Sequence, residues 1–176
     1  MSVFDFSIFT DCNLLKSNIQ VRDEKDIEFN GEIKKYFEFE LITNPLRIST
    51  PVDNVEELGI RLVLPPKDIK EAIKVLKKTP ATNPKVKDFN IMLSMFKDLE
   101  GSPNIEDSIK IIQYCNFIKK SREKEGRLIP VSIEKQLDSA TKSIVGELAV
   151  SGGYSLKTAS KNFTEITGID VDIQED

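Results

Sequence analysis

"DIEFNGEIKKYFEFELI", residues 26–42, is the stretch that decides the fold of the first part of the chain. Asn30 and Gly31 supply the two positive-φ positions of a type I′ turn, and an alternating arm lies on either side of them. In the second arm, every other position from Ile33 to Leu41 is mostly apolar and the positions between are mostly polar. One face should therefore cover a core while the other meets water, which predicts an antiparallel β-hairpin.

Neighbouring stretches extend this strand pattern over the first fifty residues. Phe4, Phe6 and Ile8 alternate with polar residues and predict a further half-buried strand. Asn44-Pro45 is expected to end the run, because proline cannot donate to a strand ladder. A short strand is also expected at "RLVL", residues 61–64.

After Thr50 the pattern changes to helices, several of them preceded by a capping residue and a proline. We expect helices at residues 51–59, 66–78, 84–99, 103–125, 132–150 and 155–167. Strands followed by helices favour an α+β fold, with an N-terminal antiparallel β-hairpin or small sheet followed by a mostly α-helical bundle. The expected regions are a β-rich residues 1–50 and a helical residues 51–176, as one compact domain or two closely packed lobes, with a hinge at residues 125–132.

Composition restricts the class of protein. The 176 residues are 39% hydrophobic and 31% charged, which is typical of a globular chain. No stretch reaches the roughly 20 apolar residues of a membrane span, and the N-terminus lacks the basic region of a secretory signal. We therefore expect a cytoplasmic protein with no membrane partner. Lysine outnumbers arginine 20 to 5, which indicates AT-rich coding of the kind found in many phages, viruses and low-GC bacteria. A phage or viral origin would give host cytoplasm or virion as the location.

The residues of common enzyme chemistry are scarce. The chain has no histidine, which removes the usual general base and the Ser-His and Cys-His pairs. It has no dinucleotide or P-loop glycine motif. Cys12 and Cys115 have no metal-site spacing and are interpreted as structural thiols. The sequence thus predicts no catalytic residue, cofactor or metal and argues against an enzyme, while carboxylate- or lysine-based chemistry stays open.

A row of lysines is the most informative surface. Within "PPKDIKEAIKVLKK", Ile69, Ile73 and Leu76 follow the spacing of a core-facing stripe, together with Ala72. The lysines follow helical spacing on another face, and their members are Lys67, Lys70, Lys74, Lys77 and Lys78. This lysine stripe predicts contact with phosphates or an acidic partner. An ordinary solvated helix face is the alternative.

The stretch "FNIMLSMF", residues 89–96, is unusually apolar for a helix. It is expected either to lie in the core or to form a protein interface. The candidate interface residues are Phe89, Met92, Met95 and Phe96.

The tail contains a helix pair with a glycine break. Glu147-Leu148-Ala149, Gly153-Tyr154-Ser155 and Gly168-Ile169-Asp170 stand in an order that resembles the second helix-turn-helix of AraC-type regulators. That resemblance implies a helix-turn-helix and assigns no DNA-contact residue. Residues 134–170 carry four lysines and five carboxylates, whereas DNA-reading units are usually basic. The residues themselves therefore favour a helical hairpin that closes the core.

Together these patterns predict a protein that acts by protein–protein binding or self-association, as an assembly or regulatory factor. Strand edges near the Asn30-Gly31 hairpin and the apolar helix are the expected contact surfaces. The alternative is a nucleic-acid-binding regulator that uses the lysine stripe on the helix at residues 66–78.

Overall fold

The computed structural model describes residues 7–10, 17–41, 44–55, 60–102 and 104–171. Strands come first and helices follow, which confirms the predicted α+β fold. The chain divides into two compact units, a sheet unit at Met1–Val63 and a helical unit at Leu64–Asp176. Strand pairing continues past residue 50, so the change from sheet to helix comes at residues 63 and 64.

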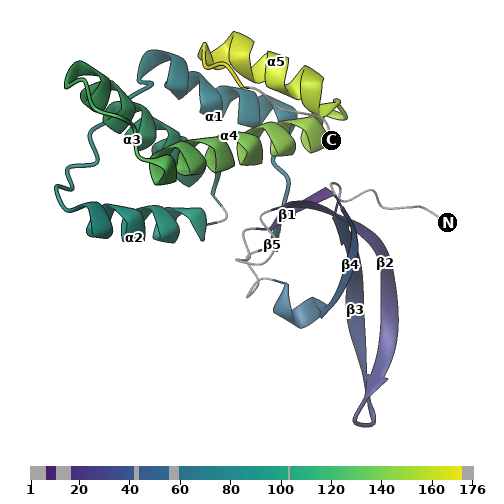
Figure 1. Cartoon of the computed structure of the whole chain (residues 1–176). Helices are drawn as coiled ribbons and strands as arrows, with labels where there is room; N and C mark the ends of the chain where they lie inside the picture. The colour runs from purple at the N-terminus through teal and green to yellow at the C-terminus, as the bar shows by residue number, and fades with distance from the viewer. Residues whose placement is uncertain (1–6, 11–16, 42–43, 56–59, 103, 172–176) are drawn as a thin grey trace. The chain divides into compact units, whose positions relative to one another are not determined.

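The sheet unit is a five-stranded antiparallel sheet in the order β4-β3-β2-β1-β5. Its strands are β1 (Ser7–Thr10), β2 (Ser17–Phe29), β3 (Glu32–Leu41), β4 (Asn44–Pro51) and β5 (Ile60–Leu62). The longest two, β2 and β3, form the predicted hairpin (Figure 1). Asn30 and Gly31 take φ angles of 53° and 80°, which confirms the positive-φ turn.

One face of β3 carries the packed residues of this unit. Phe39 is buried and its ring lies 6.0 Å from that of Phe37, and Thr50 on β4, which pairs with Phe37, is buried as well. The apolar side predicted from Ile33 to Leu41 therefore covers a core only at the β4 end. Ile33, at the turn end, is 74% exposed. Phe4 and Phe6, assigned to a strand from sequence, lie outside the described residues.

Two expectations about the end of this unit are wrong. Asn44-Pro45 does not end the strand run, because β4 starts there. The sheet tolerates proline here since β4 is an edge strand, and one of its sides needs no ladder donor. The helix expected at residues 51–59 is instead a single 3₁₀ turn, η1 (Val52–Asn54), in the described part of that range. The strand expected at "RLVL" is confirmed by β5.

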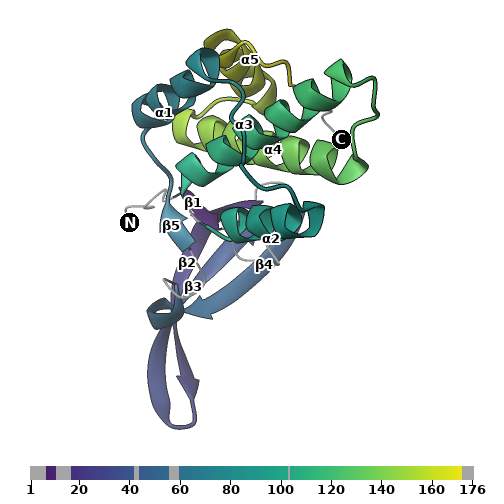
Figure 2. The same cartoon turned by 90° about the vertical axis from the view of Figure 1, so that its left-hand side faces the viewer.

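The helical unit contains α1 (Pro66–Lys78), α2 (Phe89–Glu100), α3 (Ile105–Lys124), α4 (Val131–Gly152) and α5 (Leu156–Thr167). The α3 and α4 helices pack on each other, and α1 and α5 lie against them, with α2 beside α3 (Figure 2). The largest buried side chains come from all five helices, so the unit has one shared core.

The α1 helix follows from its sequence pattern. Pro66 begins it at a position where a missing N–H costs nothing. Ile69, Ile73 and Leu76 are fully buried as predicted, and each such side chain contributes about 1.5–3 kcal/mol through burial. Ala72, expected on the same stripe, is half-buried.

The tail helices form the predicted helical hairpin. The α4 helix ends at Gly152 and is capped by Gly153, which is left-handed with φ 62°. Ser155 caps α5 by accepting a hydrogen bond from the Thr158 amide at 3.2 Å. The α5 helix runs back along α4 and α1 (Figure 1). Its Ala159 and Phe163 are fully buried, so this face closes the core.

The start of α2 differs from expectation. Asn83-Pro84 does not cap it, because Lys85 adopts a left-handed φ of 58° and its N–H donates to Asn83 Oδ1 at 2.8 Å. The helix begins at Phe89, where Asp88 caps it by accepting from the Asn90 and Ile91 amides. Similarly, α3 begins at Ile105 rather than residue 103.

The connection between α1 and α2 is fastened to α3. The Gln113 amide donates to Thr79 O at 2.6 Å, and Asn116 donates to Pro80 O at 3.0 Å. Gln113 O in turn accepts from the Thr82 amide at 3.0 Å. These bonds pair backbone groups of residues 79–82, which have no partner within a helix or strand of their own.

Candidate functional site

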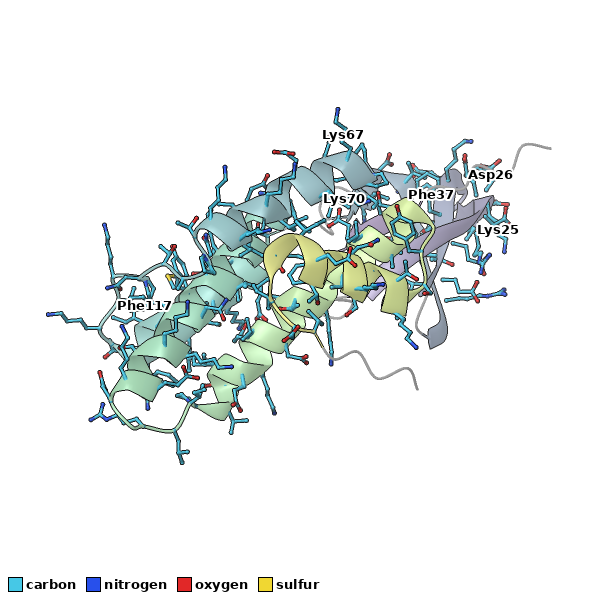
Figure 3. All side chains as sticks on the ribbon, turned by 90° about the horizontal axis from the view of Figure 1, so that it is seen from above. Lys25, Asp26, Phe37, Lys67, Lys70 and Phe117 are labelled. Carbon is cyan, nitrogen blue, oxygen red and sulfur yellow. The ribbon has the colours of Figure 1, made fainter. Side chains whose placement is uncertain are left out.

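The β2–β3 hairpin continues beyond its neighbours in the sheet unit. The register pairs β1 with β2 only at Ser17–Gln20, and pairs β4 with β3 only from Tyr36 onward. Residues 22–35 therefore form a two-stranded ribbon, called here the hairpin arm (Figure 1). Every side chain of the arm whose burial is described is exposed. Figure 3 shows Lys25 and Asp26 extending from the ribbon.

A β-bulge decides which side chains share a face of the arm. The register pairs Val21 with Phe39 and then Asp23 with Glu38, so it skips Arg22. Side chains alternate along a strand, so the extra residue exchanges the two faces of β2 beyond it. As a result, the acidic row lies on the same face as Phe37 and Ile33. Its members are Glu24, Asp26 and Glu28.

Ion pairs hold the two strands of the arm together. Lys35 pairs with Glu24, and Lys25 pairs with Glu38. The Lys25 ammonium holds the pKa of Glu38 below its usual range by hydrogen bonding, against the opposing effect of desolvation. The Lys25, Lys35 and Glu24 side chains are solvent-exposed, so these ion pairs add little to stability.

The lysine stripe lies on α1 as predicted. Lys67, Lys74 and Lys77 are exposed, together with Lys78, while Lys70 is half-buried. Figure 3 shows Lys67 pointing away from its helix. Glu71 pairs with Lys74 at 2.5 Å and is the only carboxylate in an ion pair with the stripe within the residues described. The Lys74 ammonium lowers the pKa of Glu71, chiefly through that hydrogen bond.

An aromatic ring lies beside the lysine stripe, and the sequence pattern did not predict its presence there. Tyr154, from the turn between α4 and α5, has its hydroxyl 3.4 Å from Lys70 Nζ. The same ammonium lies 5.4 Å from the centre of the ring. The ring packs on Gly152, where an added Cβ would stand 2.1 Å from Tyr154 Cε2. Eighty-four residues separate Lys70 from Tyr154, so no local pattern could indicate this contact.

The α2 surface differs from the predicted interface. Met92 and Phe96 are buried in the helical unit, and the Phe96 ring lies 6.4 Å from that of Tyr114 on α3. They therefore serve the core and not an accessible surface. Phe89 is partly exposed and Met95 half-buried, while Ile91, not predicted for the interface, is 62% exposed.

The connection between α3 and α4 exposes two further apolar side chains. Leu128 is 91% exposed and Val131 is 64% exposed. Arg122 fixes this segment by donating to Leu128 O at 3.3 Å and accepting from the Arg127 amide at 2.9 Å. The sequence pattern predicts a hinge here and did not indicate a contact surface.

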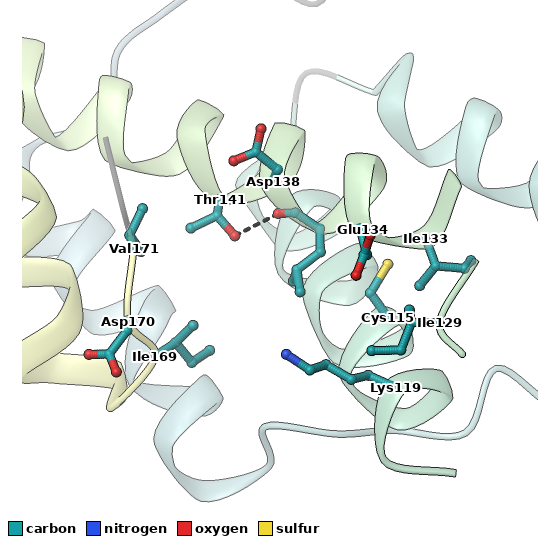
Figure 4. A pocket seen from close by; sticks show the side chains of 11 residues that line it. Cys115, Lys119, Ile129, Ile133, Glu134, Asp138, Thr141, Ile169, Asp170 and Val171 are labelled. Carbon is teal, nitrogen blue, oxygen red and sulfur yellow. Dashed lines mark hydrogen bonds between the residues drawn. The ribbon is translucent and has the colours of Figure 1, made fainter. Parts of the chain in front are cut away.

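A pocket of about 290 Å³ lies between α3, α4 and the segment after α5 (Figure 4). Its lining is Cys115, Lys119, Ile129, Ile133, Glu134, Leu137, Asp138, Thr141, Ile169, Asp170 and Val171. Burial raises the pKa of the Cys115 thiol to about 12, and the charge of Glu100 adds to the effect. The thiol thus stays protonated near neutral pH and serves as a packed side chain, not a nucleophile.

Within the described ranges, no cluster of three or more acidic or cysteine side chains is placed to hold a metal ion. Among those same residues, no helix combines the length and apolarity needed to cross a membrane. Compared with known proteins, the chain matches no protein-family model and no curated protein.

Proposed function

We propose that this chain binds another protein through its hairpin arm, as an assembly or regulatory factor. The observation that supports this is the exposure of both faces of the arm together with the shortness of the flanking strand pairings. A two-stranded ribbon without a packed face is only marginally stable in water. An arm of this kind that extends beyond its sheet is well suited to contact a partner.

The energetics of the arm support the same proposal. Its cross-strand ion pair between Lys35 and Glu24 is solvent-exposed and contributes little. Ile33 is 74% exposed and Ile27 is 38% exposed, so Ile33 in particular gains little from burial in the free chain. Contact with a partner would bury these side chains, and backbone groups at the strand edge would form hydrogen bonds with that partner.

A register-preserving truncation tests the proposal. Residues 26–28 pair with residues 33–35, so deleting both triplets shortens the arm and keeps Asn30 and Gly31. The deletion removes two carboxylates and two lysines, which leaves net charge unchanged. Cross-linking mass spectrometry in the native host should capture a partner through Lys25 in the full-length arm and lose it after truncation. Identical partners for both forms, at equal thermal stability, would overturn the proposal.

The lysine stripe supports a second candidate function, nucleic-acid binding. Four exposed lysines on one helix face, with Tyr154 packed against the fifth, provide charge for phosphates. The affinity for a nucleic acid should then fall steeply with salt, and the variant K67Q/K74Q/K77Q should weaken it and flatten the salt dependence. The matched control is K119Q/K120Q/K124Q at the end of α3, where the lysines are also exposed. Equal loss in both variants would argue against a role for the stripe.

A further inference from the structure

We propose that the partner of the hairpin arm supplies an extended basic segment, which adds as a strand to the outer edge of β2. This inference rests on the proposed function and names the chemistry of the partner. Two independent observations support it, the unpaired edge of β2 and the charge carried on one face of that strand.

The first observation concerns the backbone. The β1 strand covers β2 at Ser17–Gln20, and no other described strand pairs with the same side of β2 from residue 21 to residue 29. The N–H and C=O groups along that edge can therefore receive a strand. Strand addition would give the partner main-chain hydrogen bonds, and side-chain charge would select which partner fits.

The second observation is the acidic row. Beyond the bulge, Glu24, Asp26 and Glu28 occupy successive positions on one face of β2 and all are exposed. Lys35 neutralises one of these charges through its pair with Glu24, which leaves the row negative. Without the bulge, the same face would carry Lys25 and Ile27 in place of Asp26 and Glu28. The bulge at Arg22 therefore places the three carboxylates together on one face of β2.

The acidic row disfavours a second copy of the chain as the occupant. In a twofold antiparallel pairing of two β2 edges, residues of the same face oppose one another. Depending on the register, Asp26 would then oppose its own equivalent, or Glu24 would oppose Asp26 of the second copy. Like charges directly opposite one another destabilise strand pairing, so the edge selects against self-pairing and in favour of a basic strand.

The acidic row also defines the spacing of basic side chains expected in the partner strand. Side chains on one face of a strand recur every second residue, roughly 6.6–6.8 Å apart. A complementary strand would therefore carry lysine or arginine at alternate positions, opposite the three carboxylates. The sheet unit as a whole supports this, because residues 1–63 hold 7 basic and 12 acidic side chains, a net charge of −5. Such a field attracts a basic segment during the encounter.

Binding of two synthetic peptides to the full-length chain tests this inference. One peptide, capped Thr-Lys-Val-Lys-Val-Lys-Thr, places lysines at alternate positions, and the other has the same composition with its lysines consecutive. Backbone amide shifts and titration calorimetry should show that the alternating peptide binds at least several-fold more tightly and perturbs residues 23–29. The variant E24Q/D26N/E28Q should bind it roughly tenfold more weakly, as expected from the loss of three cross-strand charge pairs.

The control variant D98N/E123Q/E134Q neutralises three exposed carboxylates of the helical unit instead, and should bind the alternating peptide like the wild type. Equal binding of both peptides, or equal weakening in both variants, would overturn the inference and show non-specific charge attraction. If arm truncation abolishes capture of the natural partner while E24Q/D26N/E28Q does not, only the basic-strand inference fails. If truncation leaves capture unchanged, the proposed function fails.

Discussion

Leu64 has both of its backbone polar groups held by side chains of α4. Its N–H donates to Glu147 Oε1 at 3.1 Å, and its C=O accepts from Ser151 Oγ at 2.5 Å. Glu147 and Ser151 stand four residues apart, one helical turn, so they reach the same residue. Glu147 is buried, and this contact gives it a structural role. Its place in the "ELA" part of the tail motif is thus explained by packing within the helical unit.

Replacing Glu147 should therefore cost stability and leave binding at the arm unchanged. We expect Glu147→Leu to lower the free energy of unfolding by about 1–3 kcal/mol, because the partly buried Leu64 N–H loses its acceptor. Glu147→Gln retains an acceptor oxygen and should cost less. Urea unfolding measures both, and exchange of the Leu64 amide should accelerate in Glu147→Leu. Equal costs for the two variants would show that the hydrogen bond to Leu64 is not the cause.

At the scale of elements, the turn of the hairpin arm depends on glycine. Gly31 has φ 80° with open space around a would-be Cβ, so only the backbone conformation opposes a side chain there. Gly31→Ala should destabilise the turn by about 1–2 kcal/mol and accelerate amide exchange in residues 23–35. Gly101→Ala is the matched control, because Gly101 ends α2 at φ −77° and its added Cβ meets only ordinary contacts. Similar exchange in the arm of both variants would contradict this reason.

The first turn of α3 gives the helical unit an acid-sensitive contact. Partial burial alone would raise the pKa of Asp107, but hydrogen bonds from Lys110 and Ser102, both at 2.6 Å, outweigh it and lower that pKa. A carboxyl whose pKa is lower in the folded state stabilises the fold above its unfolded pKa of about 3.9. This contribution is lost as the pH falls through the folded pKa.

Asp107→Asn should accordingly be less stable than the wild type at pH 7, and the difference should shrink as the pH falls below about 4. Chemical denaturation at a series of pH values measures this difference. Asp98→Asn, an exposed change on α2, should leave the pH dependence as in the wild type. A difference that stays constant down to pH 2 would assign the effect of Asp107→Asn to packing instead of charge.

These elements also show where sequence patterns suffice. The Asn30-Gly31 turn and the buried stripe of α1 depend on residues close together in the chain, so local patterns predict them. The bulge at Arg22 depends on pairing with β3, and the extended connection at residues 79–82 depends on hydrogen bonds with α3. In α2 itself, apolar residues lie on most sides of the helix, so their spacing could not distinguish buried Phe96 from exposed Ile91. Sequence patterns therefore predict these elements, while which of their side chains are exposed depends on tertiary contacts.

For the whole molecule, charge and core are divided between the two units. The sheet unit has a net charge of −5, whereas residues 64–176 hold 18 basic and 17 acidic side chains, a net charge of +1. In the sheet unit, Phe39 and Thr50 are the buried residues among those whose burial is described. The helical unit buries side chains from all five of its helices. Among the residues whose burial is described, most of the buried apolar side chains therefore belong to the second unit.

This division predicts that residues 64–176 fold without the sheet unit. The fragment retains Leu64 with both of its α4 partners, and its core includes Ile73, Phe96 and Leu148. A single packed core of this size is sufficient for cooperative folding. Circular dichroism of the fragment should show a helical spectrum and one sigmoidal urea transition. A broad, non-cooperative transition would show that the helical unit depends on residues 1–63. As a control for the cut itself, Glu147→Leu in the fragment should lower stability by the same amount as in the full chain, because the Leu64 contact lies entirely within the unit.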